Sequence, residues 1–457
     1  MSDSDAQEPM ARRVGGTELS WCKAVPSGTG ITVLALLLSK PPNIPTLQSA
    51  LRHLQICHPI LRSTLHFDPL TAAFSYITLP SPSLQIHLFD LPSTLTILNE
   101  NSNNNNPIPP HQYILEHEMN INPWSSPTDD AVLFYASVYT LSEMKWVLVL
   151  RLHTSACDRT SAVALLREVL EVMSGGEAEN YKEEMGAPIE ECVPAGKNNK
   201  PFWARGMDVV GYSLNSFRLA HLNFVDANSA RCSQVMRLQM NSGDTFKLLE
   251  GCKSRGIKLC GALAAAGLIA AHVSKDLPGN QSQKYAVVTL VDCRSILDPV
   301  LNSHSFGFYH SAILNTHDIN GGDELWEVAN RCYTSFANAK NNGKHFTDMG
   351  DLNFLMGKAI DNPGLTPSAS SRTACISVFE DNVIDESSPM LGELGIDDYI
   401  GCASAHGIGP SLALFHTIRD GRLDCACVYP SPLHSREQIQ KLTDDMKIIL
   451  VNSFEES

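Results

Sequence analysis

The stretch Leu150–Ser161 reads LRLHTSACDRTS and joins two different sequence patterns. Just before its His, Lys145–Leu152 (KWVLVLRL) is a largely apolar run, which is typical of a buried strand. The stretch ends at Ser161, and the residues from there on, Ser161–Met173, have a pattern that predicts a helix. His153 therefore stands at the C-terminal end of a strand, and Asp158 stands just before a helix. Strand ends are where α/β folds place reactive groups.

Two interpretations of this His and Asp stay open on the residues alone. A neutral imidazole, with an ordinary pKa near 6.5, is suited to act as a general base. A structural His beside an Asp that caps the next helix would give the same pattern. The sequence has no G-x-S-x-G, no G-x-x-x-x-G-K-[ST] and no G-x-G-x-x-G. The sequence therefore lacks the motifs that usually indicate serine hydrolysis, kinase chemistry or hydride transfer.

Length and charge limit the class of protein. The chain has 457 residues, and 34 Lys+Arg against 49 Asp+Glu give a formal net charge of −15. A single hydrophobic core stops growing at about 250–300 residues, so we expect two domains. Because phosphates repel an acidic surface, the balance argues against a nucleic-acid or anionic-membrane partner.

Cysteine usage and the N-terminus indicate the compartment. The thirteen cysteines show no C-x-x-C, and no H-E-x-x-H occurs, so we expect free thiols and no metal site. The first residues, MSDSDAQEPMARR, lack the pattern of a signal peptide. Apolar runs are too short or too rich in Ala and Gly to predict a membrane span. We therefore expect a cytoplasmic protein without membrane contact. A monomer is a separate expectation.

Predicted strands and helices alternate in both halves of the chain, which favours an α/β or α+β architecture of two domains, 14–220 and 221–457. Residues 1–13 are expected to be disordered. The further elements predicted in the first half are a strand over Ile31–Leu38 and a helix over Thr46–Cys57 capped by Thr46. Those predicted in the second half are strands over Ser233–Met240, Tyr285–Val291, Ser411–Arg419 and Arg422–Val428, and helices over Asp244–Ser254 (capped by Asp244), Leu259–Val273, Asp323–Ala339 and Ser435–Val451.

Several short motifs follow one another in a fixed order. They are His58–Ser63 (HPILRS), His153–Arg159 (HTSACDR), Asp292-Cys293-Arg294, then Pro299 and Phe306-Gly307-Phe308, and finally Asp420–Leu423 (DGRL). In this order they resemble the HPxLR, HHxxxDG and DxR…P…FGN motifs and the closing hairpin of the condensation-domain superfamily. That superfamily includes peptide-synthetase condensation domains, alcohol acetyltransferases, BAHD acyltransferases and chloramphenicol acetyltransferase. The resemblance extends over nearly the whole chain from about Gly15.

The resemblance implies a fold and a reaction. The fold is α/β, with two chloramphenicol-acetyltransferase-like domains of mixed sheets flanked by helices and a tunnel between them. The reaction moves an acyl group from acyl-CoA, a co-substrate, to a small-molecule alcohol or amine, without any further cofactor. The resemblance also implies that Asp158 pairs with Arg294 and holds the motif loop in place.

The motif departs from the family pattern at its most important position. In HHxxxDG the second His is the catalytic base, and Thr154 stands in its place here. His153 aligns with the first His, and Arg159 aligns with the Gly. Since neighbouring residues of an extended segment point to opposite sides, a strict register would turn His153 away from the tunnel.

Two alternatives follow for the site. In the first, a bulge re-aims His153 into the tunnel, and the chain is an acyltransferase with His153 as base and Thr154 as a lesser catalytic candidate. In the second, the register is strict, and the protein is a binding module, a degenerate enzyme, or an enzyme with a recruited base. The candidates for a recruited base are His304, His310 and His406. The candidates for other tunnel-facing positions are Ser404, His406 and Gly307.

Overall fold

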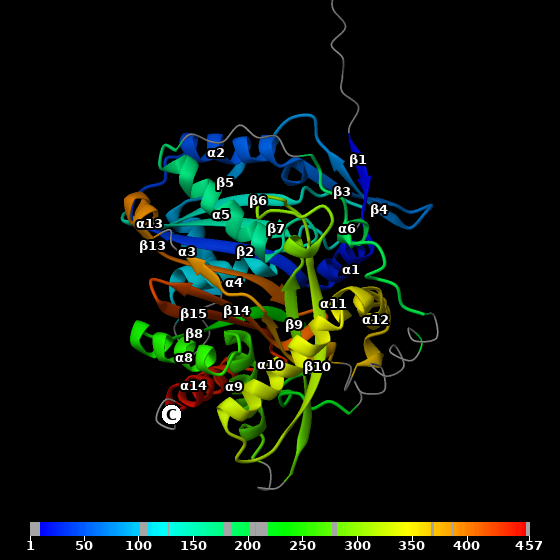
Figure 1. The fold of residues 1–457 in the computed structure, drawn as a ribbon. Helices are drawn as coiled ribbons and strands as arrows, with labels where there is room; N and C mark the ends of the chain where they lie inside the picture. The colour runs from blue at the N-terminus through cyan, green and yellow to red at the C-terminus, as the bar shows by residue number, and fades with distance from the viewer. Residues whose placement is uncertain are drawn as a thin grey trace, which may run out of the picture.

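The computed structural model describes residues 10–100, 108–126, 128–176, 184–201, 206, 218–276, 281–366, 370–385 and 388–453. Figure 1 shows two lobes, with the N-terminal elements in the upper lobe and most C-terminal elements in the lower lobe. The chain therefore consists of two α/β halves that follow each other in sequence, apart from a helix and a strand of the second half, α13 (Ser388–Leu394) and β13 (Ile396–Ala405), which lie in the upper lobe.

The upper lobe is built on a mixed sheet in the order β13-β2-β7-β6-β5. Its strands are β2 (Thr29–Leu38), β5 (Ile86–Phe89), β6 (Phe134–Ser142), β7 (Lys145–His153) and β13 (Ile396–Ala405). A small sheet in the order β1-β4-β3 lies beside it and contains β1 (Ala11–Arg13), β3 (Ser63–Asp68) and β4 (Ala73–Thr78). The helices of this half are α1 (Gly16–Ala24), α2 (Ile44–Cys57), α3 (Leu91–Glu100), α4 (Pro110–Asn120), α5 (Arg159–Met173) and α6 (Ile189–Cys192).

Strand β2 is apolar from Val33 to Leu38, as is typical of a strand whose two faces are both covered. The even-numbered residues Leu34, Leu36 and Leu38 pack in the core that contains residues of α2 and α5. The odd-numbered residues Ile31, Val33 and Ala35 pack in a second core that contains residues of α4. β7 follows the same alternation, with Leu148, Leu150 and Leu152 on the α5 side and Val147 and Val149 on the α4 side. This pleat decides on which face each residue of the motif lies.

The lower lobe is built on a sheet in the order β10-β9-β11-β14-β15-β8, with β12 paired to β14. Its strands are β8 (Cys232–Gln239), β9 (Gln283–Asp292), β10 (His310–Ile319), β11 (Arg372–Phe379), β12 (Val383–Asp385), β14 (Gly409–Arg419) and β15 (Arg422–Ser431). The helices of this half are α8 (Ser242–Ser254), α9 (Leu259–Val273), α10 (Leu325–Asn341), α11 (Lys344–Thr347), α12 (Met349–Asp361), α13 (Ser388–Leu394) and α14 (Arg436–Asn452).

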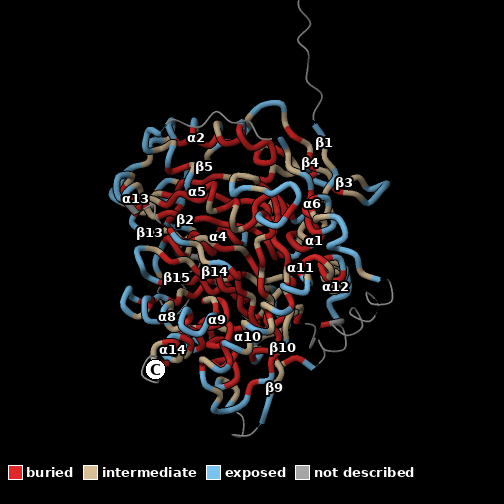
Figure 2. Tube along the Cα trace, in the orientation of Figure 1, coloured by how far each residue is buried: buried red, intermediate tan, exposed pale blue. Residues whose placement is uncertain are grey.

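Helix α9 is the central helix of the lower lobe. Every residue from Leu259 to His272 is buried, and the helix contacts β11, α10 and α14 (Figure 2). Its small residues permit this close packing, since a Cβ added to Gly267 would lie 2.3 Å from the Ile376 side chain. No single helix in the described ranges is long and apolar enough to cross a membrane; α8 and α9 meet that test only together, as a pair bent by 106°.

The two halves share structure. β13 belongs to the second half of the chain but pairs antiparallel with β2 in the upper lobe. α4, from the first half, contacts β8 of the lower sheet, where Gln112 donates to the Val235 carbonyl at 2.8 Å and Glu116 pairs with Arg436 at 2.6 Å. The residues before and after 220 therefore do not form two independent sheets, because β13, which follows residue 220, is part of the upper sheet.

Several local predictions need correction. The expected disordered start, 1–13, is wrong for Ala11–Arg13, which pairs with β4; residues 1–9 lie outside the described residues. Thr46 and Asp244 do not cap their helices. Asn43 and Asn241 do, because α2 and α8 begin two residues earlier than the apolar spacing indicated. The predicted strand Ile31–Leu38 and the helix Leu259–Val273 are confirmed.

Candidate active site

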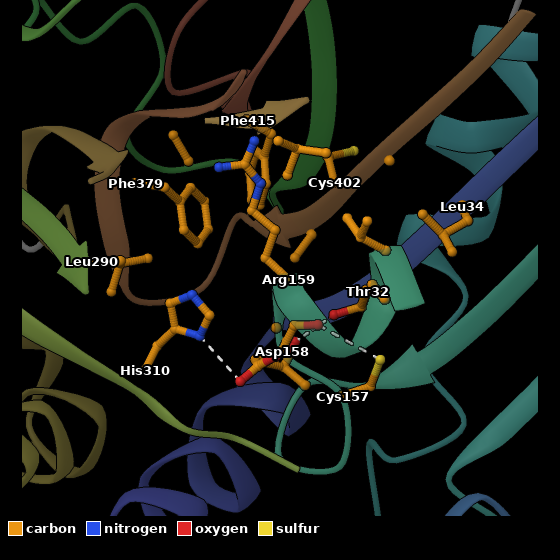
Figure 3. Close-up of a pocket in the computed structure, with 18 of the residues that line it drawn as sticks. Thr32, Leu34, Cys157, Asp158, Arg159, Leu290, His310, Phe379, Cys402 and Phe415 are labelled. Atoms are coloured by element: carbon orange, nitrogen blue, oxygen red, sulfur yellow. Dashed lines mark hydrogen bonds and ion pairs between the residues drawn. The ribbon is translucent and has the colours of Figure 1, made fainter. Parts of the chain in front are cut away.

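A cavity of about 160 Å³ lies between the two lobes. Its walls come from β2, β13 and the N-terminal turns of α5 on one side, and from β9, β11 and β14 on the other. The lining is mainly apolar and aromatic; its aromatic members are Trp21, Phe308, Phe379, Tyr399 and Phe415. Phe379 and Phe415 are labelled in Figure 3. Such an apolar concave site with a few polar groups is typical of a small-molecule site.

Several hydroxyl groups line the cavity on the side of β2 and β13, among them those of Thr32, Thr154 and Ser404. Thr32 and Thr154 are hydrogen-bonded to each other through their Oγ1 atoms at 2.8 Å. The Oγ of Ser404 accepts from the Ile31 amide at 2.9 Å. Thr154 thus faces the cavity at the position where the family motif has its second His, and the predicted placement of Ser404 agrees with the structure.

His153 lies on the opposite face of the sheet and does not line the cavity. β7 pairs with β2 without a register shift as far as Ile31 and His153, so the first alternative, a bulge that re-aims His153, is wrong and the strict register is observed. The imidazole is fully buried; its Nδ1 accepts from the Ser155 hydroxyl at 2.7 Å, and its ring packs edge-on against Trp124. Burial lowers the pKa of His153 to about 3, so the ring is neutral at physiological pH.

Asp158 holds the motif loop to the second half of the chain. Its Oδ1 caps α5 by accepting from the Ser161 amide at 2.9 Å, and its Oδ2 lies 2.9 Å from Nη1 of Arg294. The Tyr309 amide donates to Oδ2 at 2.9 Å. Burial opposes ionisation, but the positive charge of Arg294 and the neighbouring His310 outweigh it and hold the pKa of Asp158 well below its usual value. The ion pair that the resemblance implied is therefore present.

His310, the first residue of β10, is the histidine that faces the cavity. Its Nδ1 lies 3.0 Å from Oδ2 of Asp158, although the two groups are not aligned as a hydrogen bond. Figure 3 shows this nitrogen directed at Asp158 and the other ring nitrogen directed away from it, toward Phe379 and Arg159. The Phe379 ring packs edge-on against the imidazole at 5.7 Å. A carboxylate at Nδ1 favours the tautomer in which Nε2 is free to accept a proton.

The other predicted positions lie outside the cavity wall. Gly307, with φ of +153°, directs its carbonyl to the Asp158 amide at 3.1 Å and so supports the motif loop. His406 packs over Gly28 and bonds Ser233 at 2.9 Å, and His304 lies 2.6 Å from Glu168. Gly307 and His406 are therefore not the cavity-lining residues that we expected, and His304 is not placed to act there.

The most informative residue that the sequence did not single out is Arg159, whose guanidinium enters the cavity. The sequence does show an Arg where the motif has Gly. That this Arg enters a cavity can be predicted only when the strands of the second half that lie opposite it are known. Within the described ranges, no group of three or more His, Cys, Asp or Glu is placed to hold a metal ion. All thirteen cysteines are free thiols.

Comparisons with known proteins rest on structure. No protein-family model matches the sequence, and no curated protein matches it either. The trichothecene 15-O-acetyltransferase from Fusarium sporotrichioides is 12% identical, with a TM-score of 0.71, over 99% of this chain and 97% of that one. Polyketide synthase associated protein 5 from Mycobacterium tuberculosis is 16% identical, with a TM-score of 0.67, over 97% of both chains.

The first condensation domain of the calcium-dependent antibiotic synthetase is 16% identical, with a TM-score of 0.66, over 97% of both chains. At such identities the likeness establishes the fold. The chain has the two-lobed α/β fold of condensation domains and chloramphenicol-acetyltransferase-like enzymes, and the predicted fold class is confirmed. A tunnel that runs through the molecule stays a prediction.

Proposed function

We propose that this protein is an acyltransferase that moves an acyl group from a CoA thioester to a small alcohol or amine, with His310 as the general base. The observation that carries the proposal is the His310–Asp158 pair on the wall of an apolar cavity between the lobes. The fold supports it, because an acetyltransferase and a condensation domain are among the structures with the same architecture.

The proposed reaction needs one base and close positioning of two substrates. The acceptor oxygen or nitrogen attacks the thioester carbonyl carbon while its proton passes to Nε2 of His310. The tetrahedral intermediate then collapses, the carbon–sulfur bond breaks, and the same proton passes to the departing thiolate. Asp158 stabilises the imidazolium that exists between these two steps, as a buried carboxylate does beside a catalytic His.

The misaligned contact between His310 and Asp158 is compatible with this role. Catalytic hydrogen bonds are often poorly aligned without substrate and tighten when it binds. The side chains of Thr32, Thr154 and Ser404 offer neutral hydroxyl groups near the same wall. Their proposed role is to hydrogen-bond the acceptor or the developing oxyanion, because a Thr hydroxyl is too weak a base to remove the proton by itself.

The test is thiol release. The protein is incubated with acetyl-, butyryl- or longer acyl-CoA and a panel of alcohols and amines, and free CoA is measured together with the acylated product. We expect the release of free CoA to depend on the acceptor. We also expect this release to fall in a His310→Asn variant whose melting temperature is unchanged. If wild type and variant release thiol at the same rate, His310 is not the base. If no acceptor gives product, the protein acts by binding and not by acyl transfer.

A further inference from the structure

Arg159 places a positive charge inside the apolar cavity. Its Cζ lies 4.5 Å from the centroid of the Phe379 ring, and Figure 3 shows the guanidinium beside Phe379 and Phe415. Nη1 donates to the Asp381 carbonyl at 3.3 Å, and Nη2 donates to the His416 carbonyl. Two carbonyls and one aromatic face therefore fix the orientation of the group, while a guanidinium has five N–H donors in all.

The charge of Arg159 has no ion-pair partner among the described residues. Buried Arg372 shares this property, but its guanidinium is surrounded by backbone carbonyls and does not line the cavity, whereas many other interior arginines pair with a carboxylate. The arginines with a carboxylate partner include Arg151, Arg237, Arg294 and Arg436. The acids of this region are engaged elsewhere: Asp158 pairs with Arg294, the Asp381 carboxylate pairs with Lys258, and Asp385 accepts from the Tyr399 hydroxyl. Burial lowers the pKa of Arg159 to about 10, which reflects the missing counter-charge.

We propose that Arg159 binds a carboxylate on the substrate, so that the cavity selects a molecule with an apolar body and one carboxylate group. The aromatic walls suit the apolar body, and a fixed planar guanidinium suits two-point binding of a carboxylate. A carboxylate there would supply the charge that the protein itself does not supply. This inference rests on the proposed acyl transfer in the same cavity, and it leaves open whether the acceptor or the acyl group bears the carboxylate.

Matched substrates separate these two sources. In the acceptor arm, para-hydroxyphenylacetate is compared with its methyl ester, with acetyl-CoA as donor. In the donor arm, succinyl-CoA is compared with butyryl-CoA, with a neutral alcohol as acceptor. We expect the wild-type protein to prefer the carboxylate in one arm by about 10- to 100-fold in kcat/KM, the range of a charge-assisted contact. Equal kcat/KM for both members in both arms overturns the inference but leaves acyl transfer intact.

Variants test whether Arg159 is responsible. Arg159→Met is expected to remove the preference, while Arg159→Lys retains part of it because the charge remains. The matched control is Arg255→Met, since Arg255 also bonds a backbone carbonyl and stacks on an aromatic ring, that of Trp326, but does not line the cavity. Melting temperatures identify variants that fail to fold. A folded Arg159→Met protein that keeps the full preference overturns the assignment.

Calorimetric binding separates this inference from the proposed reaction. Para-hydroxyphenylacetate, its methyl ester, succinyl-CoA and butyryl-CoA are each titrated into wild type and Arg159→Met without a second substrate. If the wild type binds one carboxylate more tightly than its neutral match and the variant does not, the carboxylate site stands even without turnover. If neither pair is discriminated in binding or in turnover, the inference is wrong, whatever the outcome of the thiol-release assay.

Discussion

Two buried histidines lie close to the motif loop, and their surroundings differ in every respect that matters for catalysis. His153 ends β7, packs against Trp124 on the α4 side of the sheet, and has no carboxylate beside it within the part of the chain that the structure describes. His310 begins β10, lines the cavity and lies 3.0 Å from Asp158. His153, which aligns with the first His of the motif, is thus turned away from the cavity, and the histidine that lines the cavity stands on a strand of the other half of the chain.

The largest expected effect comes from making the same substitution at both histidines. His310→Asn keeps a donor near Asp158 but removes Nε2, so kcat/KM should fall by about 10²- to 10⁴-fold, the usual worth of a general base. His153→Asn keeps an acceptor for Ser155 and should leave kcat/KM close to wild type. Steady-state kinetics of acyl transfer, with melting temperatures as a folding check, distinguish the two. A folded His153→Asn protein without activity would reverse the comparison.

The next effect concerns the carboxylate that His310 shares with Arg294. Asp158→Asn leaves the Arg294 charge buried without its closest partner, which should lower the free energy of unfolding by about 3–5 kcal/mol. Urea unfolding measures this loss. The control is Asp130→Asn, which removes an exposed contact to His66 and should cost less than about 1 kcal/mol. Similar losses for both variants would mean that Asp158 does not hold the two halves together.

A smaller effect on stability is expected from the protonation of His153. In the folded protein its pKa is about 3, and in the unfolded chain it is near 6.5. Between these values the unfolded chain binds a proton that the folded protein does not, so His153 destabilises the fold increasingly as pH falls below 6.5, and this contribution vanishes above that pH. At pH 5 it should reach about 2 kcal/mol.

His153→Asn should therefore lose less stability than wild type when the pH is lowered from 7 to 5. The difference between the two urea-unfolding curves at each pH isolates this residue, because the other histidines are common to both proteins. Parallel losses would show that the ring of His153 can be protonated in the folded state, which contradicts its closed surroundings.

The smallest effect is expected at Thr154. Thr154→Val removes the hydrogen bond to Thr32 without changing the shape of the side chain, so kcat/KM should fall by about 2- to 10-fold, the worth of one neutral hydrogen bond. Thr154→Ser should stay close to wild type. A loss as large as that of His310→Asn would instead make Thr154 part of the proton-transfer machinery.

The sequence predicted those features that depend on local patterns. The continuous run of small and apolar residues predicted the helix Leu259–Val273, which is α9, and the Asp-Gly turn at Asp420 predicted the hairpin of β14 and β15. The pleat argument predicted that His153 and Thr154 point to opposite faces. Two features depend on contacts between residues far apart in the chain. One is which face of the sheet borders the cavity, and the other is the position of His310 beside Asp158. No local pattern reports such contacts, and the same holds for the capping residues Asn43 and Asn241, which lie just outside the apolar repeat.

The pairing of β13 with β2 has a consequence for the order in which the protein is made. The first half of the chain leaves the ribosome with one edge of β2 uncovered, and the strand that covers it, Ile396–Ala405, is synthesised near the end. Until then a long apolar edge is available to other chains, which is the usual origin of aggregation during folding. A fragment that ends near residue 220 lacks the strand that completes its sheet, so expressing the first lobe by itself should yield an aggregation-prone product. Residues 388–453 supplied in trans are the piece that would complete it.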